Sequence, residues 1–110
     1  MSGKFEIKNT SNDQFMFNLK AGNGEIVLTS EMYTTKASAK NGIESVRENS
    51  EKDQRFDRRT AKDYSPYFVL KAANGEIIGN SEMYSSTNAM ENGIESVKKN
   101  AKEAELVDLS

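Results

Sequence analysis

An internal duplication constrains this chain more than any other feature. Residues 17–49 and 68–100 align without a gap at an offset of 51, and 19 of the 33 aligned positions are identical. Both copies contain the runs NGEI, SEMY and NGIESV. A copy of this size seldom buries a core alone. We therefore expect residues 1–51 and 52–110 to be two repeats that pack into one domain.

Within each repeat the apolar pattern first has the period of a strand. Residues 15–20 and 67–71 alternate between apolar and polar side chains, and each segment is followed by Asn-Gly at 23–24 or 74–75. Asn-Gly between two strand patterns is the strongest short hairpin signal. The returning strands are predicted at 25–33 and 76–84, and earlier strands at 5–8 and 56–59. We also expect the lysine before each turn, Lys20 or Lys71, to pair with Glu25 or Glu76 across the hairpin.

The pattern then changes to the period of a helix. Apolar residues repeat at helical spacing after position 39 and again after position 90, and hydroxyl side chains at 34–35 and 85–86 precede them as candidate N-caps. An ion pair between Glu95 and Lys99 is expected on the second helix. The unit of three strands and a helix, used twice, predicts a two-layer α+β domain. The last apolar residues, 106–109, are open to assignment as a strand, a helical extension or an anchored tail.

Composition excludes several classes of function. The 110 residues contain no Cys and no His, which removes thiolate nucleophiles, thiolate metal sites and the commonest general base. No converging acidic motif or phosphate-binding loop is present. We expect no cofactor, no metal site, no catalytic residue and no enzymatic activity. The formal net charge of −2 argues against nucleic acid as a partner.

The polar segment Met1–Lys4 and the short apolar runs indicate where in the cell the protein resides. No apolar run approaches the roughly 20 residues that a membrane-spanning helix needs, and the N-terminal residues lack the apolar stretch of a signal peptide. We expect a cytoplasmic protein that does not enter a membrane, and a monomer.

The residues of both repeats together carry a family resemblance. The pattern FxLKAxNGEIIxxSEMY, a short spacer and NGIESVxxN resembles the YegP-like family of small bacterial proteins of unknown function, in its duplicated form. The resemblance implies two tandem β-β-β-α(-β) repeats that form a single antiparallel sheet, with two helices on one face and the terminal strands exchanged between repeats. It assigns 106–109 to a strand that crosses to the first repeat, and implies no catalytic residue.

Two duplicated features are candidates for a functional role. Gly42 and Gly93 interrupt the helical patterns, which indicates either close packing or turns that shorten the helices. The SEMY segments place Glu31 and Tyr33, or Glu82 and Tyr84, after a strand. These four residues are candidate binding residues in two related sites. The structural alternative is that each Tyr packs at the corner between strand and helix.

The junction between the repeats suggests another candidate surface. Residues 51–63 contain five basic and four acidic side chains, with Phe56, Tyr64 and Tyr67 nearby. Arg58 and Arg59 could flank aromatic rings on an open sheet face and hold single-stranded nucleic acid weakly. We interpret the protein first as a non-enzymatic binding or accessory module with an unknown partner, and weak single-stranded nucleic-acid binding is the alternative.

Overall fold

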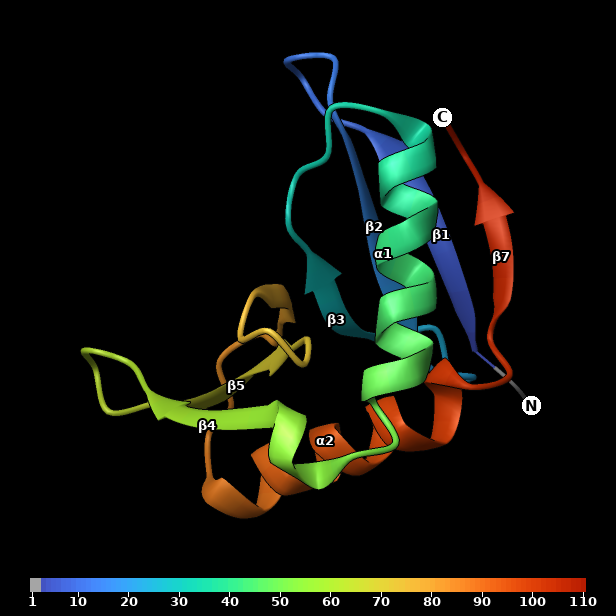
Figure 1. Ribbon diagram of the computed structural model, residues 1–110. Coiled ribbons are helices and arrows are strands. Elements are labelled where there is room, and N and C mark those ends of the chain that lie inside the picture. Colours follow the sequence, from blue (N-terminus) through green and yellow to red (C-terminus); the bar gives the residue numbers. More distant parts are fainter. Residues whose placement is uncertain (1–2) are drawn as a thin grey trace.

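The computed structural model describes residues 3–110, and its elements follow the duplication (Figure 1). The first repeat contains β1 (Lys4–Asn9), β2 (Phe15–Lys20), β3 (Ile26–Ser30) and α1 (Lys36–Asn49). A short 3₁₀ helix, η1 (Asp53–Arg55), leads into the second repeat. That repeat contains β4 (Phe56–Thr60), β5 (Pro66–Lys71), β6 (Ile77–Asn80), α2 (Thr87–Ala101) and β7 (Glu105–Asp108). The predicted tandem α+β architecture is confirmed.

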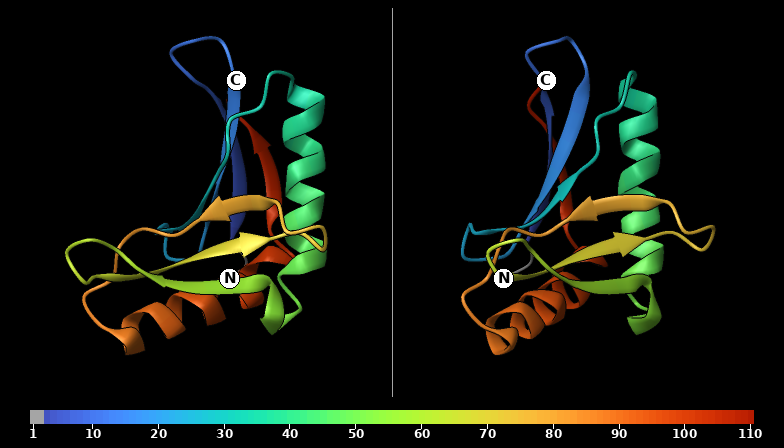
Figure 2. Two further views of the ribbon diagram at one scale, coloured as in Figure 1. Left: turned by 60° about the vertical axis from the view of Figure 1, so that its left-hand side comes forward. Right: turned by 90° about the vertical axis from the view of Figure 1, so that its left-hand side faces the viewer.

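All seven strands belong to one sheet in the order β4-β5-β6-β3-β2-β1-β7. The repeats meet where β3 pairs antiparallel with β6, through Thr29 opposite Asn80 and Ser30 opposite Gly79. The sheet is strongly twisted, so the strands of the second repeat cross steeply over the direction of β1 and β2 (Figures 1 and 2). The two repeats are therefore joined by continuous backbone pairing at the centre of the sheet.

Two details of the implied sheet differ from the expectation. β7 does cross to the first repeat, but it pairs with β1 in parallel, whereas the expected sheet was antiparallel throughout. The chain leaves α2 beside the beginning of β1, where the Glu105 N–H donates to the Gly3 carbonyl at 3.2 Å, so β7 must run in the same direction as β1. The exchange is also unequal. Residues 54–57, which correspond to β7 at the offset of 51, belong to η1 and the beginning of β4, and within residues 3–110 β4 pairs with β5 and with no strand of the first repeat.

The two hairpin turns form as the Asn-Gly pattern predicts. Gly24 and Gly75 have φ of 87° and 88°, a conformation that glycine adopts without a steric penalty. The predicted cross-turn ion pairs are wrong. A register shift after Leu19 places Lys20 opposite Ile26, and the Lys20 ammonium instead contacts Glu6 on β1 at 3.0 Å. The same shift occurs in the second repeat, where Lys71 contacts Asp57 at 3.2 Å.

Both helices lie on one face of the sheet and share one core with it (Figure 2). Thr35 and Ser86 cap the helix N-termini by accepting hydrogen bonds from the backbone N–H groups of Ser38 and Ala89. The fully buried core side chains include Phe5, Phe17, Ile43, Phe68 and Ile94. The expected Glu95–Lys99 pair is wrong, because Glu95 pairs with Lys98 one residue earlier at 3.3 Å.

Candidate functional site

Two clefts lie between the repeats and are related by the duplication. The first, here named the α1 cleft, lies between the α1 side of the first repeat and the β5–β6 hairpin of the second, and has a volume of about 420 Å³. Its polar wall comes from the SEMY segment and α1, and its opposite wall comes from the hairpin. The residues that define it are Glu31, Tyr33, Asn41, Ser45, Glu76 and Ile77.

The α2 cleft repeats this arrangement with the roles of the repeats exchanged. It lies between α2 and the β2–β3 hairpin of the first repeat, and has a smaller volume of about 170 Å³. Its defining residues lie at an offset of 51 from those of the α1 cleft: Glu82, Tyr84, Asn92, Ser96, Glu25 and Ile26. Each cleft thus requires both repeats, and each contains one of the predicted Glu and Tyr pairs.

The tyrosine of each cleft is fixed between an aromatic ring and a helix glycine. The Tyr33 ring stacks on Phe17 at a centroid distance of 6.2 Å and an interplanar angle of 12°. A Cβ atom at Gly42 would collide with the Tyr33 hydroxyl. Gly93 bears the same relation to Tyr84. The packing interpretation of both glycines is confirmed, since only glycine leaves room for the tyrosine between helix and sheet.

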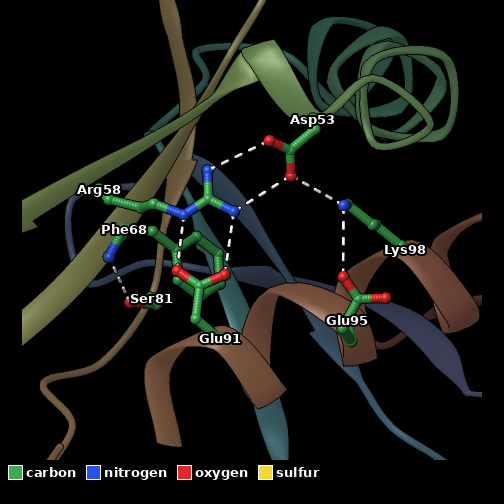
Figure 3. Close-up of polar contacts among 7 residues, drawn as sticks. All are labelled: Asp53, Arg58, Phe68, Ser81, Glu91, Glu95 and Lys98. Carbon is green, nitrogen blue, oxygen red and sulfur yellow. Dashed lines mark hydrogen bonds and ion pairs between the residues drawn. The ribbon is translucent and has the colours of Figure 1, made fainter. Parts of the chain in front are cut away.

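The serine of each SEMY segment fixes the backbone at the glutamate that follows it. The Ser30 hydroxyl accepts a hydrogen bond from the Phe17 backbone N–H at 2.8 Å and donates one to the Glu31 carbonyl at 2.7 Å. Ser81 makes the same two bonds with Phe68 and Glu82, at 3.0 and 2.8 Å; Figure 3 shows the bond to Phe68. Both serines are buried, whereas both glutamates are exposed. The serine thus fixes the backbone of the segment, and the exposed Glu31 and Glu82 side chains line the two clefts.

Acidic groups set the electrostatics of both clefts. Burial raises the pKa of the Tyr33 hydroxyl, and the nearby Glu31 carboxylate raises it further. Burial also raises the pKa of Tyr84, with contributions from Glu82 of its own repeat and Glu25 of the other. Carboxylates of both repeats thus act on the Tyr84 hydroxyl. Within residues 3–110, no Lys or Arg lines either cleft, so both clefts favour positive charge.

The two candidate arginines of the junction point to opposite faces of the sheet. Arg58 lies on the helix side, where its guanidinium contacts Glu91 at 2.6 Å and Asp53 at 3.1 Å (Figure 3). These contacts raise the pKa of Arg58 and lower that of Glu91, while Lys98 and then Arg58 lower the pKa of Asp53. Arg59, the next residue along the strand, pairs with Asp57 at 3.0 Å. Successive side chains of a strand alternate between faces, so these arginines do not form one surface.

The cleft residues outside the SEMY segments were not identified from the sequence. The turn pattern predicts ion pairs for Glu25 and Glu76, and no sequence pattern indicates that Asn41 and Asn92 line a cleft. Their place in a cleft depends on how β3 meets β6, which local patterns do not specify. The available signal was the duplication itself, because every defining position of one cleft has a counterpart 51 residues away in the other.

Membrane and metal sites were searched for within residues 3–110. No helix in that range is long and apolar enough to cross a membrane. The same residues contain no group of three or more acidic side chains placed to hold a metal ion. The two clefts are lined by the predicted candidates Glu31, Tyr33, Glu82 and Tyr84, whereas a larger hollow beside α2, of about 630 Å³, is lined by none of them.

Comparison with known proteins places the chain in a family. The Domain of unknown function (DUF1508) matches it twice, at residues 10–57 and 61–108. A UPF0339 protein of Shewanella oneidensis is 57% identical over 110 residues, all of both chains, and the UPF0339 protein YegP of Escherichia coli O157:H7 is 55% identical over 100 residues, 91% of each.

Two solution NMR structures have the same fold. The UPF0339 protein of S. oneidensis superposes with a TM-score of 0.93 at 58% identity, covering 99% of this chain and 92% of that one. YegP of E. coli, described as a protein of unknown function, gives a TM-score of 0.94 at 50% identity, covering 99% and 94%. The chain, which contains the DUF1508 unit twice, therefore belongs to the YegP-like family of uncharacterised proteins.

Proposed function

We propose that this protein is a non-enzymatic binding module that holds cationic groups of small ligands in the α1 and α2 clefts. The observation that carries the proposal is the recurrence of one arrangement in both clefts, a carboxylate from each repeat beside a packed tyrosine. The absence of His and Cys from the sequence supports a binding role over catalysis. Its apolar runs are short and its charges balanced, which supports a cytoplasmic monomer made of the repeats 1–51 and 52–110.

The charge and size of the clefts favour an amine-bearing ligand. An ammonium group near two carboxylates gains favourable electrostatic energy and can donate hydrogen bonds to both. The α1 cleft, at about 420 Å³, lies within the range of small-molecule sites, roughly 300–1,000 Å³. The α2 cleft, at about 170 Å³, has room for a single group. We therefore expect the α1 cleft to bind the larger ligand.

An NMR titration with n-butylammonium tests this proposal, with 1-butanol as the neutral control of similar shape. We expect n-butylammonium to shift the backbone amide signals of Glu31, Gly42 and Glu76, and 1-butanol to leave them unchanged. Glu31→Gln removes one charge without a change of shape and should weaken binding in the α1 cleft about tenfold, the effect of one charged hydrogen bond. The matched substitution Glu82→Gln should affect only the α2 cleft. Equal shifts with both compounds, or none with either, would overturn the proposal.

Single-stranded nucleic-acid binding is a second candidate, supported by the charges on the sheet face away from the helices. Glu6 on this face contacts Lys8 and Lys20, at 4.0 and 3.0 Å. Asp57 makes the equivalent contacts with Arg59 and Lys71, at 3.0 and 3.2 Å. Each carboxylate is shared by two cations, so each cluster retains a positive charge.

Fluorescence anisotropy with a labelled oligo(dT) strand at low salt tests this second candidate. Arg59→Gln should weaken binding, because Arg59 lies on the open face. Arg58→Gln serves as the control, because its guanidinium is held by carboxylates on the helix side. Salt-insensitive anisotropy, or an equal effect of the two substitutions, would exclude a strand bound on this face.

A further inference from the structure

The α1 cleft continues into a second hollow along α1. This hollow has a volume of about 320 Å³, and it shares Ser45 and Ala72 with the α1 cleft as lining residues. Beyond these it is lined by Glu48, Asn49, Lys52, Arg55 and Asn74. We refer to the α1 cleft and this hollow together as the α1 groove. The groove follows the helix from its first turn to the junction that leads to β4.

The two ends of the α1 groove carry opposite charges. Glu31 and Glu76 lie at the end near the beginning of α1, and Lys52 and Arg55 lie at the other end. Within the described chain neither Lys52 nor Arg55 forms an ion pair, and the buried Arg55 Nε has no hydrogen-bond partner. Glu48 also lines the basic end, but it is exposed to solvent. With Glu48 counted, the basic end has a net charge of +1, and its two cations are not held in ion pairs within the described chain.

The equivalent groove beside α2 lacks this basic end. Its outer hollow is lined by Glu95 and Lys99, which leave it without a net positive charge. The residues equivalent to Lys52 and Arg55 at the offset of 51 are Glu103 and Leu106. The two grooves thus share their acidic ends and differ at the opposite ends. Residues that differ between otherwise matched sites indicate which contacts distinguish their ligands.

We propose that the α1 groove binds a short extended peptide with free termini, an inference that rests on the proposed function of the α1 cleft. The peptide's ammonium group lies between Glu31 and Glu76, and its terminal carboxylate lies at Lys52 and Arg55. Arginine suits this role because its planar guanidinium can bind a carboxylate through two parallel hydrogen bonds. Polar side chains along the groove, including Asn41 and Asn74, face the peptide backbone as donors and acceptors.

The length of the helix sets the length of the peptide. Ser38 lines the acidic end and Asn49 lines the basic end, which places the ends about 16 Å apart at the rise of an α-helix. An extended chain advances about 3.3 Å per residue, so about five residues span this distance. A dipeptide is too short to reach both charged ends at once. We therefore expect affinity to rise with length up to about five residues.

Pentaglycine provides a probe without side chains, and its C-terminal amide provides the matched control. In an NMR titration, the free acid should shift amide signals at both ends of the groove, at Glu31 and at Lys52. Amidation removes the terminal charge and should weaken binding about tenfold. The double substitution Lys52→Gln and Arg55→Gln should abolish the difference between the two peptides. Lys99→Gln, which removes the charge of a lysine that lines the outer hollow beside α2, should preserve it.

The outcomes separate this inference from the proposed function. If the amide binds as tightly as the free acid, the proposed orientation of the peptide is wrong, whereas the proposal that the acidic cleft binds cationic groups is unaffected. If diglycine binds as tightly as pentaglycine, the span of the groove is overturned. If neither the peptides nor n-butylammonium shift the signals of Glu31, the proposed function falls as well. Thermal unfolding of the double variant checks its fold, and an intact fold with an unchanged preference for the free acid also contradicts the inference.

Discussion

β1 and β4 hold equivalent places in the two repeats, but their outer edges differ. The edge of β1 is covered by β7, whereas within residues 3–110 no strand pairs with the outer edge of β4. At the same position of the duplication, β1 has the fully buried Ile7 and β4 has Arg58, held by two carboxylates. Inward-pointing charges on edge strands hinder pairing with other chains. A duplicated strand thus acquires an apolar side chain where its edge is covered and a charged one where it is open.

The largest expected difference between the two strands is in the free energy of unfolding when the side chain of Ile7 or Arg58 is truncated. Ile7→Ala should lower the free energy of unfolding by about 2–4 kcal/mol, because it leaves a cavity in the core. Arg58→Ala should lower it by less than about 1 kcal/mol, because partly exposed ion pairs contribute little. Urea denaturation of both variants measures the two values. Equal losses would contradict the distinction between the covered and open edges.

Removal of the covering strand should have the next largest effect. Deletion of residues 105–110 exposes the edge of β1 and should lower the free energy of unfolding by about 2 kcal/mol, the value for burial of one apolar side chain. Leu106 and Leu109 are 37% and 56% exposed, which limits the loss. The deletion also removes the bond from the Leu109 N–H to the Ile7 carbonyl, 2.8 Å long. Hydrogen exchange should accelerate in β1 and remain unchanged in β4; uniform acceleration would show that the edges are not independent.

Making the open edge of β4 apolar should change the stability less. It should also promote association between copies of the protein. Arg58→Ile gives β4 the residue that β1 has, and should alter the free energy of unfolding by less than about 1 kcal/mol. The loss of the inward charge should permit association between copies through β4. Sedimentation velocity over a range of concentrations measures this, with Arg58→Gln as the polar control. Equal behaviour of the two variants would show that charge at this position does not protect the edge.

The smallest expected effect is a difference in acid sensitivity. Arg58 lowers the pKa of Glu91, and Lys98 and Arg58 lower that of Asp53. A carboxyl group with a lowered pKa in the folded state stabilises the protein above its unfolded pKa of about 4, and this contribution is lost as the pH falls through the lower folded value. In Arg58→Gln, the loss of stability below about pH 4 should be smaller than in the unmodified protein. Urea titrations at several pH values check this, and parallel curves would contradict it.

Local sequence patterns were sufficient to predict most elements of the fold. The Asn-Gly turns, the capping hydroxyl groups and the change of apolar period locate both hairpins and both helices, because each signal depends on neighbouring residues. The direction of β7 and the partners of Lys20 and Lys71 could not be predicted in this way. They depend on where α2 ends relative to β1, and on the register shifts after Leu19 and Leu70.

The same reasoning predicts only part of the candidate site. The SEMY segments identified Glu31, Tyr33 and their counterparts, because the repetition of a polar segment after a strand is visible in the sequence. The opposing wall of each cleft comes from the hairpin of the other repeat, and only the pairing of β3 with β6 brings it there. Arg58 and Arg59 were grouped because they are adjacent in sequence, but strand alternation separates them.

Each cleft is formed by residues of both repeats. This arrangement affects how substitutions can alter the two clefts. If a single repeat assembled as a symmetric homodimer, every substitution would appear in both of its cavities at once. Covalent fusion of the halves removes this restriction, so one cavity can alter while the other is maintained. The contrast between Lys52 and Glu103 is a difference that only a fused chain permits. Duplication in this molecule thus provides two independently adjustable cavities on a shared scaffold.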